Sequence, residues 1–339
     1  MKHKLISLLI ICLYSTCSFG QDSFKDFKIQ QSQVKISNSL YNKISFIDSR
    51  IDTTSLGIVQ VGLMNIQAKV VSSIPIALQL NNFLNSVIDS SSQDGTLLFQ
   101  IRQILFSEMT SMSSEKGYFY IRANLFSQKE NNYLKLASID TLIVVNAFDV
   151  TNQLLKAGSD LITNCISSNL LKNPTENELY TYNDILRVDS IEKRKIKIYN
   201  INGFTDGVYY SYKSFKDQNP DDKEILVKRK KDLSISKVMI KDNNNLIELK
   251  SNDLYAFVTE GQPYISTGYG YYPLYFSNDN FYFVGNVKPI TPNNSDMVAV
   301  GAMFGLIGAI IIYNSEGYGE NYFTIIDHIT GEFIKIKKM

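Results

Sequence analysis

Two stretches in the first half of the chain carry apolar residues at helical spacing. The first follows Ser73, which can cap a helix, and Pro75, whose missing N–H costs nothing in a first turn. The second begins at Asp149 and runs to about Leu171, ahead of Pro174. Each keeps a polar face, so the pattern predicts two amphipathic helices that pack on a sheet. The apolar positions are Ile76, Leu80, Phe83, Leu84, Val87 and Ile88, and then Leu154, Leu155, Gly158, Leu161, Ile162, Cys165 and Ile166.

Alternation of apolar and polar residues with a period of two predicts five strands around these helices. Two strands precede the first helix and three lie between the helices. A slip in phase at Gln103 indicates a β-bulge. Elements in this order are typical of an α+β domain, and we expect an antiparallel sheet with both helices on one face. The five runs start at Ile44, Gly57, Leu97, Tyr118 and Tyr133.

The second half of the chain is rich in aromatic residues and in short β-type runs. Residues 199–283 hold 17 of the 40 Tyr and Phe residues, and clusters of Asn, Asp and Pro separate the runs. This spacing predicts an antiparallel, Tyr-rich β domain. The last two runs flank residues 328–331 and predict a C-terminal hairpin. The expected runs are 197–199, 207–212, 225–227, 235–240, 246–249, 256–258, 271–276, 281–284, 322–327 and 332–337.

The first twenty residues have the pattern of a secretory signal peptide. A short basic segment precedes an apolar run, and Ser18-Phe19-Gly20 is a small-x-small cleavage signal. Cys17 raises the question of a lipoprotein, but Thr16 and Tyr14 fit a lipid-attachment site poorly, which favours simple cleavage. We expect a signal peptide at 1–20, a polar tether at 21–39, an α+β domain at 40–173, a linker at 174–195 and a β-rich domain at 196–339.

Composition and charge narrow the classes of function. The chain has 339 residues, of which 44% are apolar and 20% charged, as in ordinary globular proteins. Without residues 1–20 it carries 32 basic and 33 acidic residues, a net charge of −1, so we expect no nucleic-acid partner. The basic run 228–231 follows Asp221, Asp222 and Glu224, which favours a solvated loop. Contact with an anionic lipid or polysaccharide is the alternative.

The first domain resembles a known group of envelope proteins. Asp48-Ser49-Arg50 ends a predicted strand, Leu56-Gly57 begins the next, and an amphipathic helix follows. Over residues 43–170 this order resembles YajG-type envelope lipoproteins and related periplasmic auxiliary proteins, although the lipid-attachment Cys is missing. The segment with Gly207-Val208-Tyr209, Phe215-Lys216 and Pro220 is similar to uncharacterised secreted proteins of Bacteroidota-type bacteria. The first resemblance implies a non-catalytic envelope protein.

No residue pattern marks a catalytic, cofactor or metal site. After residue 20 the chain keeps one cysteine, Cys165, on the apolar stripe of a helix, and one histidine, His328, in a predicted turn. No Gly-x-Ser-x-Gly elbow supplies a nucleophile for His328. We expect no zinc site either, because the single histidine has only one cysteine to accompany it. Carboxylates are plentiful, but no spacing singles out a pair for glycoside hydrolysis.

Residues 264–276 form the segment most suggestive of binding. Tyrosine offers apolar area with a polar tip, and here five tyrosines cluster with small residues. The segment is either a binding patch or a pair of core strands, because aromatic residues also favour strands. The candidate patch comprises Tyr264, Tyr269, Tyr271, Tyr272 and Tyr275.

Residues 297–313 are 17 residues without a charge. As a helix they would reach about 25 Å, short of an apolar membrane core of about 30 Å. Glycines at helical spacing allow close helix approach. The segment is a buried element packed on the sheet, a partner interface or a membrane segment. Its candidate contact residues are Gly301, Phe304, Gly305 and Gly308.

Together these features predict an exported, non-catalytic α+β protein of the periplasm or outer membrane. It would bind or assemble with another envelope protein or polymer, without a cofactor. The alternative is a membrane-attached subunit of an envelope complex, held by residues 297–313. A carboxylate-based hydrolase is the third interpretation.

Overall fold

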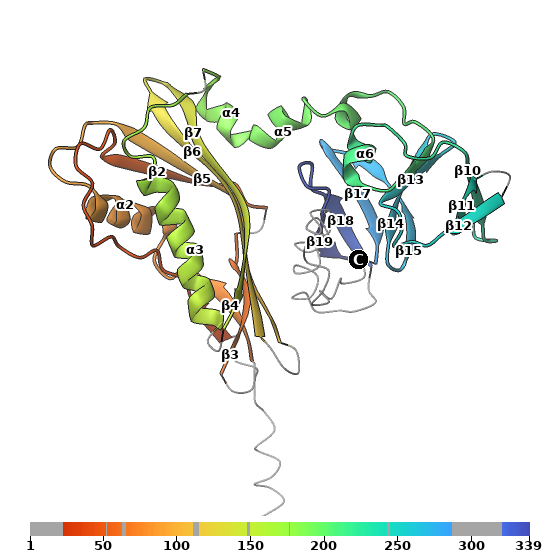
Figure 1. Ribbon diagram of the computed structural model, residues 1–339, viewed down its shortest axis with the longest axis horizontal. Coiled ribbons are helices and arrows are strands. Elements are labelled where there is room, and N and C mark those ends of the chain that lie inside the picture. The colour runs from red at the N-terminus through yellow and green to blue at the C-terminus, as the bar shows by residue number, and fades with distance from the viewer. Residues whose placement is uncertain are drawn as a thin grey trace, which may run out of the picture. The chain divides into compact units, whose positions relative to one another are not determined.

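The computed structural model describes residues 23–51, 53–62, 66–110, 115–147, 150–175, 177–242, 245–286 and 321–339 (Figure 1). The chain is broadly α+β, as predicted. It divides into two compact units, Met1–Gln128 with Leu134–Asn177, and Lys129–Tyr133 with Glu178–Met339. The division after Asn177 falls within the expected linker. Half of that segment is helical, because it contains α4 (Tyr182–Leu186) and α5 (Val188–Lys193).

The first unit is built on a mixed sheet, so the expectation of an antiparallel sheet is wrong. The strand order is β1-β4-β3-β5-β6-β7, and β2 also pairs with β5. β6 runs antiparallel along β5, whereas β2 and β3 follow one another along the opposite edge of β5 and are both parallel to it. Alternation shows which residues share a face but not the direction in which strands pair. The strands are β1 (Ser23–Asp26), β2 (Lys43–Asp48), β3 (Gly57–Val61), β4 (Ile66–Val71), β5 (Thr96–Thr110), β6 (Glu115–Lys129) and β7 (Asn132–Asn146).

The predicted bulge is confirmed, since the register of β5 against β6 shifts between Ile101 and Gln103. Both predicted helices are confirmed as α2 (Ile76–Val87) and α3 (Val150–Ser167). The N-cap of α2 is Pro75 rather than Ser73, and α3 ends at Ser167 rather than near Leu171. The predicted cap Asp149 lies outside the described residues. The two helices lie on the same side of the sheet (Figure 1). Their apolar stripes share one core with the facing residues of β5 and β6. Each Leu or Phe fully buried there contributes about 1.5–3 kcal/mol.

The described part of the expected polar tether belongs to this unit. β1 pairs in parallel with β4, Phe27 is fully buried, and its ring lies 5.0 Å from that of Phe106. The N–H of Ile29 donates to Oε1 of Gln79 on α2 at 2.6 Å. Burial of Phe27 and Ile29 therefore holds this otherwise polar segment in the domain.

The second unit contains three small antiparallel sheets. Their orders are β10-β11-β12, β15-β14-β13-β9 and β16-β17-β18-β19. The strands are β8 (Leu179–Tyr180), β9 (Gly207–Tyr209), β10 (Ile225–Arg229), β11 (Ile235–Asp242), β12 (Asn245–Leu249), β13 (Ala256–Thr259), β14 (Gln262–Thr267), β15 (Gly270–Pro273), β16 (Tyr275–Ser277), β17 (Asn280–Gly285), β18 (Tyr322–Ile326) and β19 (Phe333–Lys338).

The β15-β14-β13-β9 sheet is buried on both faces. Val258 and Ile265 enter one apolar cluster, shared with the β16–β19 sheet, whereas Phe257 and Tyr264 enter another, shared with the β10–β12 sheet. Successive residues of one strand point to opposite faces, so each strand serves two cores. This arrangement explains the density of aromatic residues in the segment.

Three expected strands of this unit differ in the structure. The expected run 271–276 is divided between β15 and β16, which belong to different sheets. Residues 197–199 lie in a 3₁₀ turn, η1 (Lys197–Asn200). The expected run 207–212 ends at Tyr209, and α6 (Tyr212–Lys216) follows. Ser211 and Ser214 form a capping box at the start of α6, and these reciprocal hydrogen bonds favour a helix there. Among the described residues, no helix has the length and apolar character needed to cross a membrane.

Candidate functional site

The five tyrosines of the predicted patch do not form one surface. Tyr264 is buried and stacks on Phe257 with ring centroids 5.0 Å apart. The guanidinium of Arg229 lies over the Tyr264 ring, 5.6 Å from its centroid, and its Nη1 donates to the Tyr264 hydroxyl at 3.1 Å. Tyr271 packs edge-on against Phe257, and its hydroxyl donates to the carbonyl of Leu249. These tyrosines join two sheets.

Burial raises the pKa of Tyr271 to about 12, so its hydroxyl stays protonated and able to donate at neutral pH. Tyr272 packs on Phe283 with centroids 5.9 Å apart, and it fills the space beside Gly285, where a Cβ would come within 2.6 Å of its ring. Only Tyr269 and Tyr275 of the five are exposed, at 49% and 46%.

Tyr275 belongs to a different surface, which we call the outer aromatic face. Tyr275 pairs across the ladder with Tyr282, and Tyr282 pairs with Ile325. Residues paired in this way point to the same face of an antiparallel sheet. The rings of Tyr275, Tyr282 and Phe323 are in contact. The ring centroids of Tyr275 and Tyr282 are 5.6 Å apart, and those of Tyr282 and Phe323 are 4.9 Å apart. The outer aromatic face comprises Tyr275, Tyr282, Val284, Phe323, Ile325 and Ile334.

The six side chains named for this face are apolar and partly open to solvent; in the strand register Phe323 pairs with Lys337. Tyr275 and Val284 are exposed, and the other four residues are half-buried, whereas Phe281 and Phe283 on the opposite face are buried. A contiguous apolar surface of this kind marks an interaction site more often than scattered apolar residues do. The predicted contact residues Gly301, Phe304, Gly305 and Gly308 lie outside the described residues.

The C-terminal hairpin holds the second notable feature, a buried turn. Oδ1 of Asp327 accepts from the N–H of Ile329 at 3.0 Å and from the N–H and hydroxyl of Thr330 at 2.8 and 3.0 Å. The carbonyl of His328 accepts from the Tyr212 hydroxyl at 2.8 Å. Gly331, at φ +80°, sits directly on the Tyr212 ring, where a side chain has no room. The turn is therefore fixed in place.

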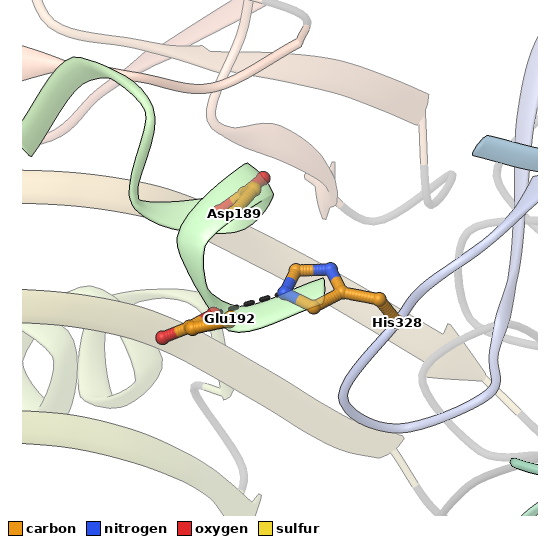
Figure 2. A group of neighbouring side chains, drawn as sticks. All are labelled: Asp189, Glu192 and His328. Carbon is orange, nitrogen blue, oxygen red and sulfur yellow. Dashed lines mark hydrogen bonds and ion pairs between the residues drawn. The ribbon is translucent and has the colours of Figure 1, made fainter. Parts of the chain in front are cut away.

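His328 lies in the predicted turn but points inward. Its side chain is 4% exposed, and its Nε2 lies 2.9 Å from a carboxylate oxygen of Glu192 on α5. Asp189 precedes Glu192 by three residues, so both carboxylates lie on one side of the helix. Figure 2 shows Glu192 facing the imidazole. One ligand atom from each of Asp189, Glu192 and His328 lies within 4.8 Å of the others.

The other residues singled out in the sequence, Cys165 and the basic run 228–231, occupy positions that the fold explains. Cys165 is half-buried against the first core, and burial raises the pKa of its thiol to about 11, which opposes a nucleophilic thiolate at neutral pH. The expectation of a loop at the basic run 228–231 is wrong for its first half, because Lys228 and Arg229 are the last residues of β10; Lys230 and Lys231 follow the strand, and all four residues are exposed. Asp242 and Asn245 pair as the last residues of the β11–β12 hairpin.

Comparison with known proteins adds no functional information. No family model and no curated protein match the chain. One solved structure, named only "Crystal structure of uncharacterized protein", is similar over 41% of this chain and 98% of its own, at 12% identity and a TM-score of 0.23. A TM-score this low does not establish a shared fold.

Two features escaped the sequence reasoning. The outer aromatic face is built from two hairpins, β16–β17 and β18–β19, that are separated in the chain by residues 286–321, so no local pattern could join them. Glu192 and His328 are separated by 136 residues, so no local pattern could join them.

Proposed function

We propose that this protein is an exported, non-catalytic binding protein of the cell envelope, and that the outer aromatic face holds a protein partner. The observation that carries the proposal is the continuous contact of Tyr275, Tyr282 and Phe323 on the open face of the β16–β19 sheet. Aromatic residues are enriched at the centres of protein interfaces, where they bury large areas. The signal-peptide pattern and the resemblance to YajG-type proteins point in the same direction.

A protein partner suits the face better than a glycan does. Val284, Ile325 and Ile334 complete the surface beside the rings, and aliphatic side chains pack well on an apolar protein surface. Glycan sites require polar groups that bond to sugar hydroxyls. The non-catalytic part of the proposal is supported by the raised pKa of the Cys165 thiol, which opposes a nucleophilic thiolate at neutral pH.

The proposal is tested by the size of the native complex in gentle envelope extracts. The full chain is expressed in its host with Tyr282→Asp, and Tyr269→Asp serves as the control, since Tyr269 is exposed but lies off the face. We expect the native chain and the control to migrate as one larger complex and Tyr282→Asp to migrate as the free chain. Co-migration of all three would contradict the proposal.

A carbonate wash of the same membranes separates the proposal from the membrane-attached alternative. A peripheral binding protein is released by the wash. A chain anchored through residues 297–313 stays with the membrane, and a charge at Gly305 then releases it.

A further inference from the structure

The group Asp189, Glu192 and His328 offers a donor set that suits a metal ion. It combines one imidazole nitrogen with two carboxylate oxygens, and these atoms lie within 4.8 Å of one another. Zn²⁺ accepts this mixture of nitrogen and oxygen ligands, whereas Ca²⁺ and Mg²⁺ take oxygen alone. The three residues come from two elements that are remote in sequence.

The histidine is held in position before any ligand arrives. Its side chain is only 4% exposed, its backbone carbonyl is bound by the Tyr212 hydroxyl, and the preceding Asp327 closes the turn. A ligand that is already ordered loses little conformational entropy when it binds, which is why fixed side chains make strong sites. The structure thus supplies a pre-organised nitrogen, a feature that an ordinary group of surface acids lacks.

The two carboxylates leave an open side. Glu192 is 29% exposed and Asp189 is exposed, so solvent reaches the cluster from the α5 side. Ligands of a tetrahedral Zn²⁺ lie about 3.3 Å apart when each is about 2.0–2.1 Å from the ion. The His328–Glu192 pair, now at 2.9 Å, needs to open slightly, and Asp189 needs a side-chain rotation to close in.

We propose that Asp189, Glu192 and His328 bind a divalent transition-metal ion, with Zn²⁺ as the best match and water in the remaining position. In the metal-free protein His328 and Glu192 contact each other directly, and the bound ion would replace that contact. This inference is independent of the proposed partner and of the outer aromatic face.

The test is titration of the full untagged chain from residue 21, freed of metal by a chelator, with Zn²⁺ alone. We expect one ion per chain with a Kd of about 1 μM or tighter, and visible d–d absorption when Co²⁺ replaces Zn²⁺. Asp189→Asn and Glu192→Gln each weaken binding by about 10-fold or more, because each removes a ligand. Glu224→Gln, an exposed carboxylate elsewhere in the same unit, leaves binding unchanged.

His328→Gln also abolishes binding, but its burial makes the two α5 variants the safer readout. Failure to bind Zn²⁺ saturably at about 100 μM, or equal binding by Asp189→Asn, Glu192→Gln and the native chain, would show that the cluster is an ion pair only.

Discussion

Gly158 shows how one residue sets the distance between a helix and the sheet. A Cβ built at this position in α3 would lie 2.7 Å from the ring of Phe106 and 3.1 Å from that of Phe119, and both rings are fully buried. The rings cannot yield, because the core is close-packed. Glycine here allows α3 to approach β5 and β6.

Gly158→Ala therefore destabilises the protein, although alanine is the better helix former by about 1 kcal/mol. Overpacking costs about 1–3 kcal/mol, so we expect a net loss of about 1 kcal/mol in the free energy of unfolding. The urea midpoint measures it. Gly203→Ala, in a loop of the second unit where a Cβ meets nothing within 4 Å, is the control for the same substitution in open space. An unchanged midpoint for Gly158→Ala would show that the packing is looser than described.

Cys165 gives a second prediction at this scale. Burial raises the pKa of its thiol from 9.0 to about 11, which lowers the thiolate fraction near pH 8 by about 100-fold. We expect alkylation of the native chain to be slower than that of the urea-unfolded chain by about this factor. The raised pKa also makes folding stability fall as the pH rises between about 9 and 11, because the unfolded chain releases the proton first. Equal alkylation rates would contradict the burial of this side chain.

At the scale of the element, the β18–β19 turn depends on Asp327. Its carboxylate accepts three hydrogen bonds within the turn. Asp327→Ala removes them and is expected to cost about 2–3 kcal/mol, at about 0.5–1.5 kcal/mol for each bond. Asp327→Asn keeps an acceptor oxygen and should cost less than half as much. Thermal unfolding of the two variants checks this order, and an Asn variant as unstable as the Ala variant would refute it.

The spacing of apolar residues correctly predicted the elements that pack one face against a single core. The stripes of α2 and α3 and the slip at Gln103 follow from local spacing, and all three are confirmed. The direction in which the strands pair could not be predicted from local spacing, because β2 and β3 pair with β5 only after the chain has passed through α2. The two-sided burial of β13 and β14 did not follow either, since a second covering layer leaves no mark on the alternation of one strand.

At the scale of the whole molecule, the chain has two units that each bury apolar residues of their own. The outer aromatic face and the Asp189, Glu192 and His328 cluster both belong to the second unit. Recognition is proposed to lie in the second.

The central claim is that the outer aromatic face touches a protein partner, and photo-crosslinking in the native cell tests it most directly. A photoreactive phenylalanine analogue replaces Tyr275 or Tyr282 in the full chain, and Tyr269 is replaced in the control, because it is as exposed as Tyr275 but lies off the face. We predict one discrete protein adduct from positions 275 and 282 and none from position 269. The same products from all three positions, or none from the face, would contradict the account.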